Sequence, residues 1–276
     1  MPDRYKAKEK KTVSGLRYWQ YGDDRKTPLV LLPGFTGVHK DLSPIANLLK
    51  EKYFVVIPEF PGWEDAAGER STYTINSYAH MVHQLLLDLQ LSRVTIVAHC
   101  MGATVALEAA REDASRIRQL ILISTPYQGG TLGQEFFLLL ARLSEKVPSK
   151  LRPIFFFWRS RFITTPMSFF VLQTRTLRRK LSLIGKVLTT QSKQNEHVLE
   201  TNWDSLIFYN YAKLHTLHVP VHLLHGEKDL LIPPTQASKL AHILPNATCT
   251  LIPHAGHLPP VETPETVVRL IESFLS

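Results

Sequence analysis

The stretch that decides the fold is Val94–Gly102, which reads Val-Thr-Ile-Val-Ala-His-Cys-Met-Gly. Its first five residues form a mostly apolar, β-branched run, which is typical of a strand buried on both faces. A helical pattern begins directly after Cys100. Small residues at Ala98 and Gly102, two positions before and after the cysteine, are what a sharp strand-to-helix turn requires. The sequence therefore predicts that Cys100 lies at such a turn.

Strands and helices alternate on both sides of this turn. Each predicted strand is a short apolar run, and each predicted helix repeats its apolar residues about every 3.6 positions. The strands are predicted at residues 16–21, 29–32, 53–57, 94–98, 117–123, 221–224 and 249–252, and the helices at 41–50, 74–89, 101–110, 234–243 and 264–275. Such alternation favours an α/β protein with a mainly parallel sheet that helices cover on both faces.

The alternation stops between residues 126 and 214, a segment with a helical pattern and many aromatic residues. The sequence predicts an α/β core from residues 1–125 and 215–276, with a helical cap of residues 126–214 inserted over one end of the sheet. The chain has a net charge of +8, and the predicted cap holds 13 Lys and Arg against 5 Asp and Glu. The excess positive charge therefore lies in the cap. One basic cluster in it comprises Arg175, Arg178, Arg179 and Lys180.

Composition excludes several classes of protein. With 276 residues, 44% hydrophobic and 20% charged, the chain has the balance of a globular protein, not of a disordered, collagen-like or disulfide-stapled one. Its two cysteines, Cys100 and Cys249, lack the spacing of a zinc site. No nucleic-acid partner is expected, because the basic charge is local and no nucleic-acid-binding motif is present. Neither a signal peptide nor an apolar run of bilayer length is visible, so the expected location is the cytoplasm.

Three polar residues each follow a predicted strand, at the edge of the sheet where sites form in open α/β proteins. They are Cys100, Asp229 and His257. A nucleophile, a carboxylate that orients a histidine, and a histidine that moves protons are the parts of a catalytic triad. The hypothesis is that Cys100 attacks the substrate, His257 acts first as base and then as acid, and Asp229 fixes its tautomer.

Each of these residues also has a plainer interpretation. A free cysteine is usually a small buried apolar residue, so Cys100 could be structural. Asp229 could be an exposed turn carboxylate, because a Gly-x-x-Asp sequence is common in loops. His254, three residues before His257, competes for the role of base. The triad hypothesis rests on finding all three groups in a consistent order, each after its own strand.

The order nucleophile, acid, histidine resembles that of the α/β-hydrolase superfamily, and the resemblance covers nearly the whole chain. It implies the α/β-hydrolase fold, and the members most similar to this chain are capped, cofactor-free esterases, lipases, lactonases, thioesterases and carbon–carbon bond hydrolases. No metal site is expected, since His254 and His257 have no third ligand nearby in the sequence. The motifs that carry the resemblance are Leu31–Phe35, Ala98–Gly102, Gly226–Asp229 with Ile232-Pro233 after it, and Gly256-His257.

The resemblance also implies an oxyanion hole beside the nucleophile. Its two donors would be the backbone N–H of Met101, the residue after Cys100, and that of Phe35. Gly34, Phe35 and His99 are expected to contact the substrate, with Gly34 leaving space for its carbonyl group.

Cys100 departs from the family pattern, because most members carry serine at this place. Two explanations stay open. Cysteine is the natural nucleophile of a few members, and a thiolate suits thioesters, lactones or transfer to a second acceptor. Alternatively, Cys100 replaces a serine and was introduced to trap an acyl-enzyme. Ala98 stands in place of the usual glycine, which many members tolerate because a methyl group is still small.

The leading hypothesis is a hydrolase that cleaves a carboxylic ester, lactone or thioester of a hydrophobic acyl group. The first alternative is an acyltransferase or a cyclising thioesterase with the same triad. The second is a non-catalytic ligand-binding protein on the same scaffold. The basic cap is either an ordinary lid with its charges in water or a surface that meets an anionic membrane or an acyl carrier protein.

Overall fold

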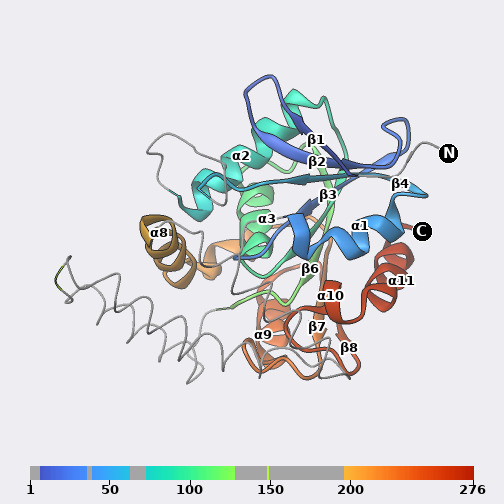
Figure 1. The fold of residues 1–276 in the computed structure, drawn as a ribbon. Coiled ribbons are helices and arrows are strands. Elements are labelled where there is room, and N and C mark those ends of the chain that lie inside the picture. The colour runs from blue at the N-terminus through green and yellow to red at the C-terminus, as the bar shows by residue number, and fades with distance from the viewer. Residues whose placement is uncertain (1–6, 36–38, 63–72, 128–147, 149–195) are drawn as a thin grey trace.

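The computed structural model describes residues 7–35, 39–62, 73–127, 148 and 196–276. The strands in these residues are β1 Lys8–Lys11, β2 Arg17–Tyr21, β3 Thr27–Leu32, β4 Tyr53–Pro58, β5 Val94–His99, β6 Ile117–Ile123, β7 Val221–Gly226 and β8 Ala247–Ile252. They form one eight-stranded sheet in the order β1-β2-β4-β3-β5-β6-β7-β8 (Figure 1). The pairs β1–β2 and β2–β4 are antiparallel and the other pairs are parallel. The carboxyl ends of β3 and β5 to β8 therefore meet at one edge.

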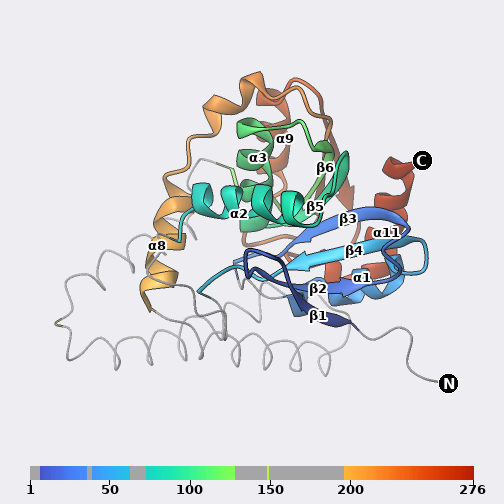
Figure 2. The same cartoon turned by 90° about the horizontal axis from the view of Figure 1, so that it is seen from above.

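Helices cover both faces of this sheet. They are α1 Ser43–Leu49, α2 Ile75–Asp88, α3 Met101–Glu112, α8 Glu196–Ile207, α9 Thr235–Ile243, α10 Pro259–Glu262 and α11 Pro264–Leu275, with the 3-10 helices η1 His39–Asp41 and η3 Tyr211–Thr216. α2, α3 and α9 pack on one face, and α1 and α11 on the other (Figures 1 and 2). Each set buries its own apolar cluster against the sheet. None of the described helices has the length and apolarity needed to cross a bilayer.

The predicted fold class is confirmed, because a mainly parallel sheet lies between two helical layers. The central strands are predictable because they are buried on both faces and so consist of continuous apolar runs. β6 and α11 begin and end at the residues that the sequence predicts.

Two elements, β1 and α10, have no counterpart in the sequence-based prediction. All four residues of β1 are exposed, and they read Lys-Glu-Lys-Lys, so they carry no apolar alternation. The strand exists through its pairing with β2. α10 is only four residues long, too short for a helical period to be recognised.

Most of the predicted cap, including its basic cluster, lies outside the described residues, so the boundaries at 126 and 214 stay a prediction. The described part contains α8, which contacts the start of α2. The hydroxyl of Ser205 accepts a hydrogen bond from the N–H of Ile75 (2.8 Å), and the side-chain amide of Asn202 donates to the hydroxyl of Tyr78 (3.2 Å). Polar contacts therefore attach α8 to α2.

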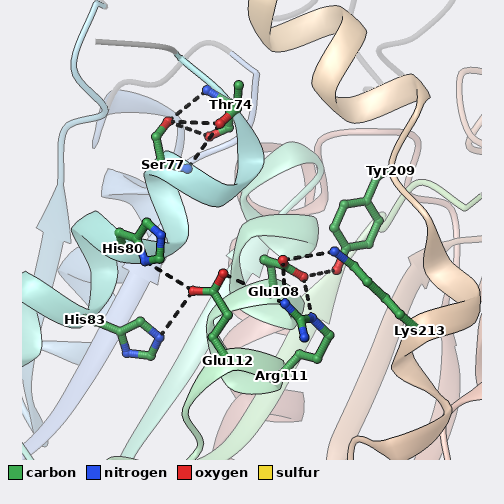
Figure 3. A network of polar contacts seen from close by, with 9 residues as sticks. All are labelled: Thr74, Ser77, His80, His83, Glu108, Arg111, Glu112, Tyr209 and Lys213. Carbon is green, nitrogen blue, oxygen red and sulfur yellow. Dashed lines mark hydrogen bonds and ion pairs between the residues drawn. The ribbon is translucent and has the colours of Figure 1, made fainter.

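A buried carboxylate attaches the chain beyond α8 to α3 (Figure 3). Glu108 of α3 is completely buried and accepts a hydrogen bond from the Tyr209 hydroxyl (2.7 Å). Its carboxylate also accepts from Lys213 Nζ (2.9 Å) and Arg111 Nε (2.9 Å). Burial by itself would raise the pKa of Glu108, but these donors outweigh burial and lower the pKa to about 2. The network joins η3 to the helix that begins directly after Cys100.

Candidate active site

Cys100 occupies a strained turn between β5 and α3. Its backbone has φ 50° and ψ −117°, a conformation that residues other than glycine rarely adopt. The N–H of Cys100 donates to the carbonyl of Ile123 in β6 (2.9 Å), and the carbonyl of Cys100 accepts from the N–H of Ala103 (2.9 Å). These bonds hold Cys100 at the amino end of α3, where unpaired helix N–H groups favour a negative charge.

Two glycines let neighbouring segments approach this turn closely. A methyl group on Gly102 would overlap the backbone carbonyl of Pro33, so the start of α3 packs directly on the end of β3. A methyl group on Gly34 would lie 2.7 Å from Nδ1 of His99 and 3.4 Å from Cβ of Cys100. The loop after β3 therefore lies against the side chain of Cys100.

The two predicted oxyanion donors flank this contact. Met101 is the first residue of α3, so its N–H has no partner within the helix. Phe35 follows Gly34 and packs, half-buried, against the apolar cluster on the α3 side of the sheet. The two N–H groups thus belong to the two segments that meet beside Cys100. Their role as oxyanion donors, and the substrate contacts of Gly34 and Phe35, stay predictions.

Asp229 and His257 form a buried pair. Nδ1 of His257 donates to Oδ2 of Asp229 over 2.9 Å, and Oδ1 accepts the N–H groups of Leu231 (2.9 Å) and Ile232 (2.8 Å). Burial favours the neutral acid, but the charge of His257 and the hydrogen bonds outweigh it and hold the pKa of Asp229 well below its usual range. Asp229 is 2% exposed, so it is a buried anion and not an exposed turn carboxylate.

Cys100 and Asp229 both affect the protonation of the His257 imidazole. Burial by itself would lower the pKa of His257. The charge of Asp229, the interaction with Cys100 and the hydrogen bond to Asp229 outweigh burial, so the pKa of His257 lies well above its usual value. The structure thus places His257 in contact with Asp229 and close enough to Cys100 for that side chain to affect its pKa.

The competing candidate, His254, lies on the surface. Its side chain is exposed, its backbone φ is 62°, and its N–H lies 3.3 Å from Oε2 of Glu227. His257 is 5% exposed and bonded to Asp229. The geometry therefore favours His257 over His254 as the partner of the carboxylate.

His99 binds the backbone of the loop that carries His257. Its Nε2 donates to the carbonyl oxygen of His257 over 2.8 Å, and its ring is 3% exposed. Burial and the charge of His257 lower the pKa of His99 to about 3, so the ring is neutral at ordinary pH. A contact between His99 and a substrate stays a prediction.

Two further residues of the site were missed by the sequence analysis. Nε2 of His225 donates to the carbonyl of Ile232 (2.7 Å) and lies 3.3 Å from Oδ2 of Asp229. Glu262 accepts hydrogen bonds from the backbone on both sides of His257. The position of His225 at the end of β7 could have revealed it, whereas Glu262 has no local signal. Within the described residues, no group of three or more His, Cys, Asp or Glu could hold a metal ion.

Comparisons with known proteins show which family and fold this chain shares. A family model described as alpha/beta hydrolase fold matches residues 27–264. The chain is 27% identical to the pimeloyl-[acyl-carrier protein] methyl ester esterase of Nitrosomonas europaea, over 89% of this chain and 94% of that protein. It is 23% identical to an uncharacterized hydrolase of Bacillus subtilis, YugF, over 96% of both chains. Among solved structures, an esterase of Exiguobacterium antarcticum matches in fold, with a TM-score of 0.80 and 16% identity over 98% of this chain and 99% of that one.

Proposed function

This chain belongs to the alpha/beta hydrolase family, and from that membership we propose that it hydrolyses a carboxylic ester, lactone or thioester through an acyl-enzyme on Cys100. The observation that carries the proposal is the buried group of Cys100, His257 and Asp229, with 2.9 Å between the histidine and the carboxylate. Packing alone would require neither the strained backbone at Cys100 nor a histidine with a raised pKa near it. The three residues therefore support covalent catalysis.

In the first half of the reaction His257 takes the proton of the Cys100 thiol, and the sulfur attacks the carbonyl carbon. A carbon–sulfur bond forms, and the electron pair of the carbonyl π bond moves to oxygen. The backbone N–H groups of Met101 and Phe35 are proposed to stabilise this oxyanion. The adduct then collapses to an acyl-thioester, and the leaving oxygen or sulfur takes the proton that His257 holds.

In the second half a water molecule replaces the leaving group. Neutral His257 removes a proton from the water as its oxygen attacks the thioester, and the sulfur of Cys100 leaves with the bonding electrons. Asp229 stabilises the imidazolium that forms again and keeps Nδ1 protonated, so that the other ring nitrogen exchanges protons with the reactants. The products are a carboxylic acid and the regenerated enzyme.

The proposed substrate carries a hydrophobic acyl group on an acidic carrier or at an anionic surface. Residues 126–214 are rich in aromatic side chains and hold the excess of basic charge, 13 Lys and Arg against 5 Asp and Glu. By its name, the relative from Nitrosomonas europaea acts on the methyl ester of an acyl group attached to an acyl carrier protein. Both observations support this substrate class.

The test is hydrolysis of a series of p-nitrophenyl esters of increasing acyl length, with intact-mass detection of the acyl-enzyme. Cys100→Ala and His257→Ala should each lose activity by about 1000-fold or more, and Cys100→Ala should lose the acyl adduct. Cys249→Ala is the matched control, because that cysteine lies exposed on β8. Wild-type turnover in His257→Ala would overturn the assignment of the catalytic residues. A rate that falls steadily as the acyl chain lengthens from acetate would rule out a hydrophobic acyl group in the substrate.

Transfer to a second acceptor is the alternative that the cysteine favours, because a thioester intermediate reacts readily with amines and thiols. Adding an alcohol or amine nucleophile to the same assay separates the two reactions. A hydrolase releases the free acid in nearly unchanged yield, whereas a transferase forms mainly the ester or amide of the added acceptor.

A further inference from the structure

Glu262 uses both oxygens of its carboxylate to hold the backbone around His257. Oε2 accepts a hydrogen bond from the N–H of Gly256 and Oε1 accepts one from the N–H of Leu258, each 2.9 Å long. Gly256 and Leu258 are the residues directly before and after His257. Because Glu262 is 8% exposed, these charge-assisted bonds are formed largely out of contact with water.

The short helix α10 returns Glu262 to this loop. It begins with Pro259-Pro260, and proline holds φ near the value that the first helical turn needs. The N–H of Glu262 donates to the carbonyl of Leu258 over 2.9 Å, while the side chain of Glu262 accepts from the N–H of Leu258. Two reciprocal hydrogen bonds therefore lock the carboxylate against the loop.

The other contacts of His257 act elsewhere on the residue. Asp229 binds Nδ1 of the ring, Cys100 raises the pKa of the ring, and His99 binds the carbonyl oxygen. Glu262 instead holds the main chain on both sides. Since the main chain sets the direction of the Cα–Cβ bond, the contact with Glu262 constrains the direction from which the ring leaves the backbone.

We propose that Glu262 is a positioning residue, which sets the imidazole of His257 between Cys100 and Asp229 by clamping the backbone on both sides of it. The proposal rests on the proposed function, in which that imidazole moves the protons. Loss of the clamp leaves two buried N–H groups without their acceptor, and the loop turns to satisfy them. Nδ1 then no longer faces Asp229 in hydrogen-bonding geometry.

The protonation of the ring reports its position, because Asp229 stabilises the imidazolium strongly only at close range. Burial lowers the pKa of His257, while Asp229 and Cys100 raise it by more. Titratable groups face the ring or its carboxylate partner from every element packed around them. They are Cys100 and His99 from the end of β5, His225 and Asp229 from the end of β7, and Glu262 from α10.

The test is an NMR titration of the His257 imidazole in the intact chain, with its signal assigned by its loss in His257→Ala. Glu262→Gln keeps the size of the side chain but turns an NH₂ group toward one of the two N–H donors. The titration midpoint of the His257 imidazole should fall by about one pH unit, which means that the ring binds its proton roughly 10-fold more weakly. For ester hydrolysis, kcat should fall about 10- to 100-fold with KM nearly unchanged.

Two further variants separate position from charge and from folding. Glu262→Asp keeps the carboxylate on a shorter stem, so it should recover part of the shift, and it tests the proposal even where the glutamine variant does not fold. Glu265→Gln removes the same charge from an exposed position at the start of α11 and should change neither the midpoint nor kcat.

An unchanged midpoint of His257 in both Glu262 variants, with only a lower melting temperature, would overturn the proposal, because Glu262 would then serve stability alone. The proposed function fails on a different result, namely wild-type ester hydrolysis by His257→Ala. A shift of the midpoint in the Glu262 variants would still support the positioning role in that case, since the titration needs no substrate.

Discussion

Single residues at the proposed site make backbone contacts that leave no space for a side chain. Gly226, at the end of β7, is the clearest example. A methyl group there would overlap the carbonyl oxygen of Gly256 and lie 2.6 Å from that of Ala255. Both carbonyls belong to the loop that carries His257. The loop of Asp229 and the loop of His257 can therefore approach each other only because residue 226 is a glycine.

We expect Gly226→Ala to push the loop of His257 away from Asp229. A backbone carbonyl cannot rotate aside as a side chain can, so the overlap should cost about 1–3 kcal/mol of stability. The displacement should lower kcat about 100-fold. Gly15→Ala is the control, because its methyl group meets nothing within 4 Å while φ 88° makes it destabilising for a separate reason. Thermal unfolding and steady-state kinetics measure both effects. Equal losses of activity in the two variants would contradict the displacement.

His99 predicts how stability depends on pH. Burial and the charge of His257 lower its pKa to about 3 in the folded chain, whereas an unfolded histidine has a pKa of about 6.5. Below about pH 6.5 the unfolded chain binds a proton here that the folded chain does not, so the free energy of unfolding falls. The loss amounts to at most about 1.4 kcal/mol per pH unit and ends near pH 3. Above about pH 6.5 both states are neutral at His99, and its contribution is constant.

His99→Gln isolates this contribution. The glutamine amide can still donate to the carbonyl of His257 but does not titrate. Urea unfolding at several pH values should give a shallower loss of stability between about pH 6.5 and pH 4 than the wild type has. His218→Gln, which changes an exposed histidine, should keep the wild-type slope. Identical slopes in all three proteins would mean that the ring of His99 is not held neutral by the fold.

The residues of the proposed triad were predictable, and the groups that hold them were not. Cys100, Asp229 and His257 each follow a strand of the sheet, and the ends of parallel strands meet at one edge. The partners of His99 and Glu262 depend on side chains meeting backbone atoms in three dimensions. The acceptor of His99 is 158 residues away in the chain. No local periodicity carries that information.

Elements were predictable where they are buried on both faces or repeat an apolar stripe, and unpredictable where pairing alone forms them. β5 consists of six buried residues, and its sequence is mostly apolar, with Thr95 and the terminal His99 as its polar residues. β1 consists of four exposed charged residues and is a strand only because β2 supplies its hydrogen bonds. The charges of β1 also guard that edge of the sheet, since an edge strand rich in lysine resists pairing with another chain.

At the scale of elements, the Glu108 network in Figure 3 predicts how strongly the chain between α8 and η3 is attached to α3. Tyr209→Phe removes a hydroxyl that lies 2.7 Å from the buried carboxylate. The loss of a hydrogen bond to a charged group should lower the free energy of unfolding by about 1.5–3 kcal/mol. Urea unfolding measures it. Tyr53→Phe, at the half-buried start of β4, is the matched control and should cost less than about 0.5 kcal/mol. An equally small effect at Tyr209 would mean that the hydrogen bonds from Arg111 and Lys213 are enough to stabilise the buried Glu108 carboxylate.

For the whole molecule, charge and fold are distributed differently along the chain. The net charge is +8, and residues 126–214 hold all of the excess, so the core that carries the proposed triad is neutral overall. Solubility alone would not require this segregation, because charge spread over the surface serves solubility equally well. A basic region of limited extent is instead typical of a surface that meets an anionic partner.

The chain should accordingly bind vesicles of anionic lipid at low salt and leave neutral vesicles in solution. Binding should weaken as salt rises from about 0.01 M to about 0.15 M, because the screening length falls from about 30 Å to about 8 Å. Replacing Arg178, Arg179 and Lys180 by glutamine should abolish it, whereas the same change at Lys8, Lys10 and Lys11 of exposed β1 removes equal charge and should not. Co-sedimentation with the vesicles measures the binding of the wild type and of the two triple variants. Equal recovery on the two kinds of vesicle, or equal losses in the two triple variants, would show that the basic region is an ordinary solvated surface.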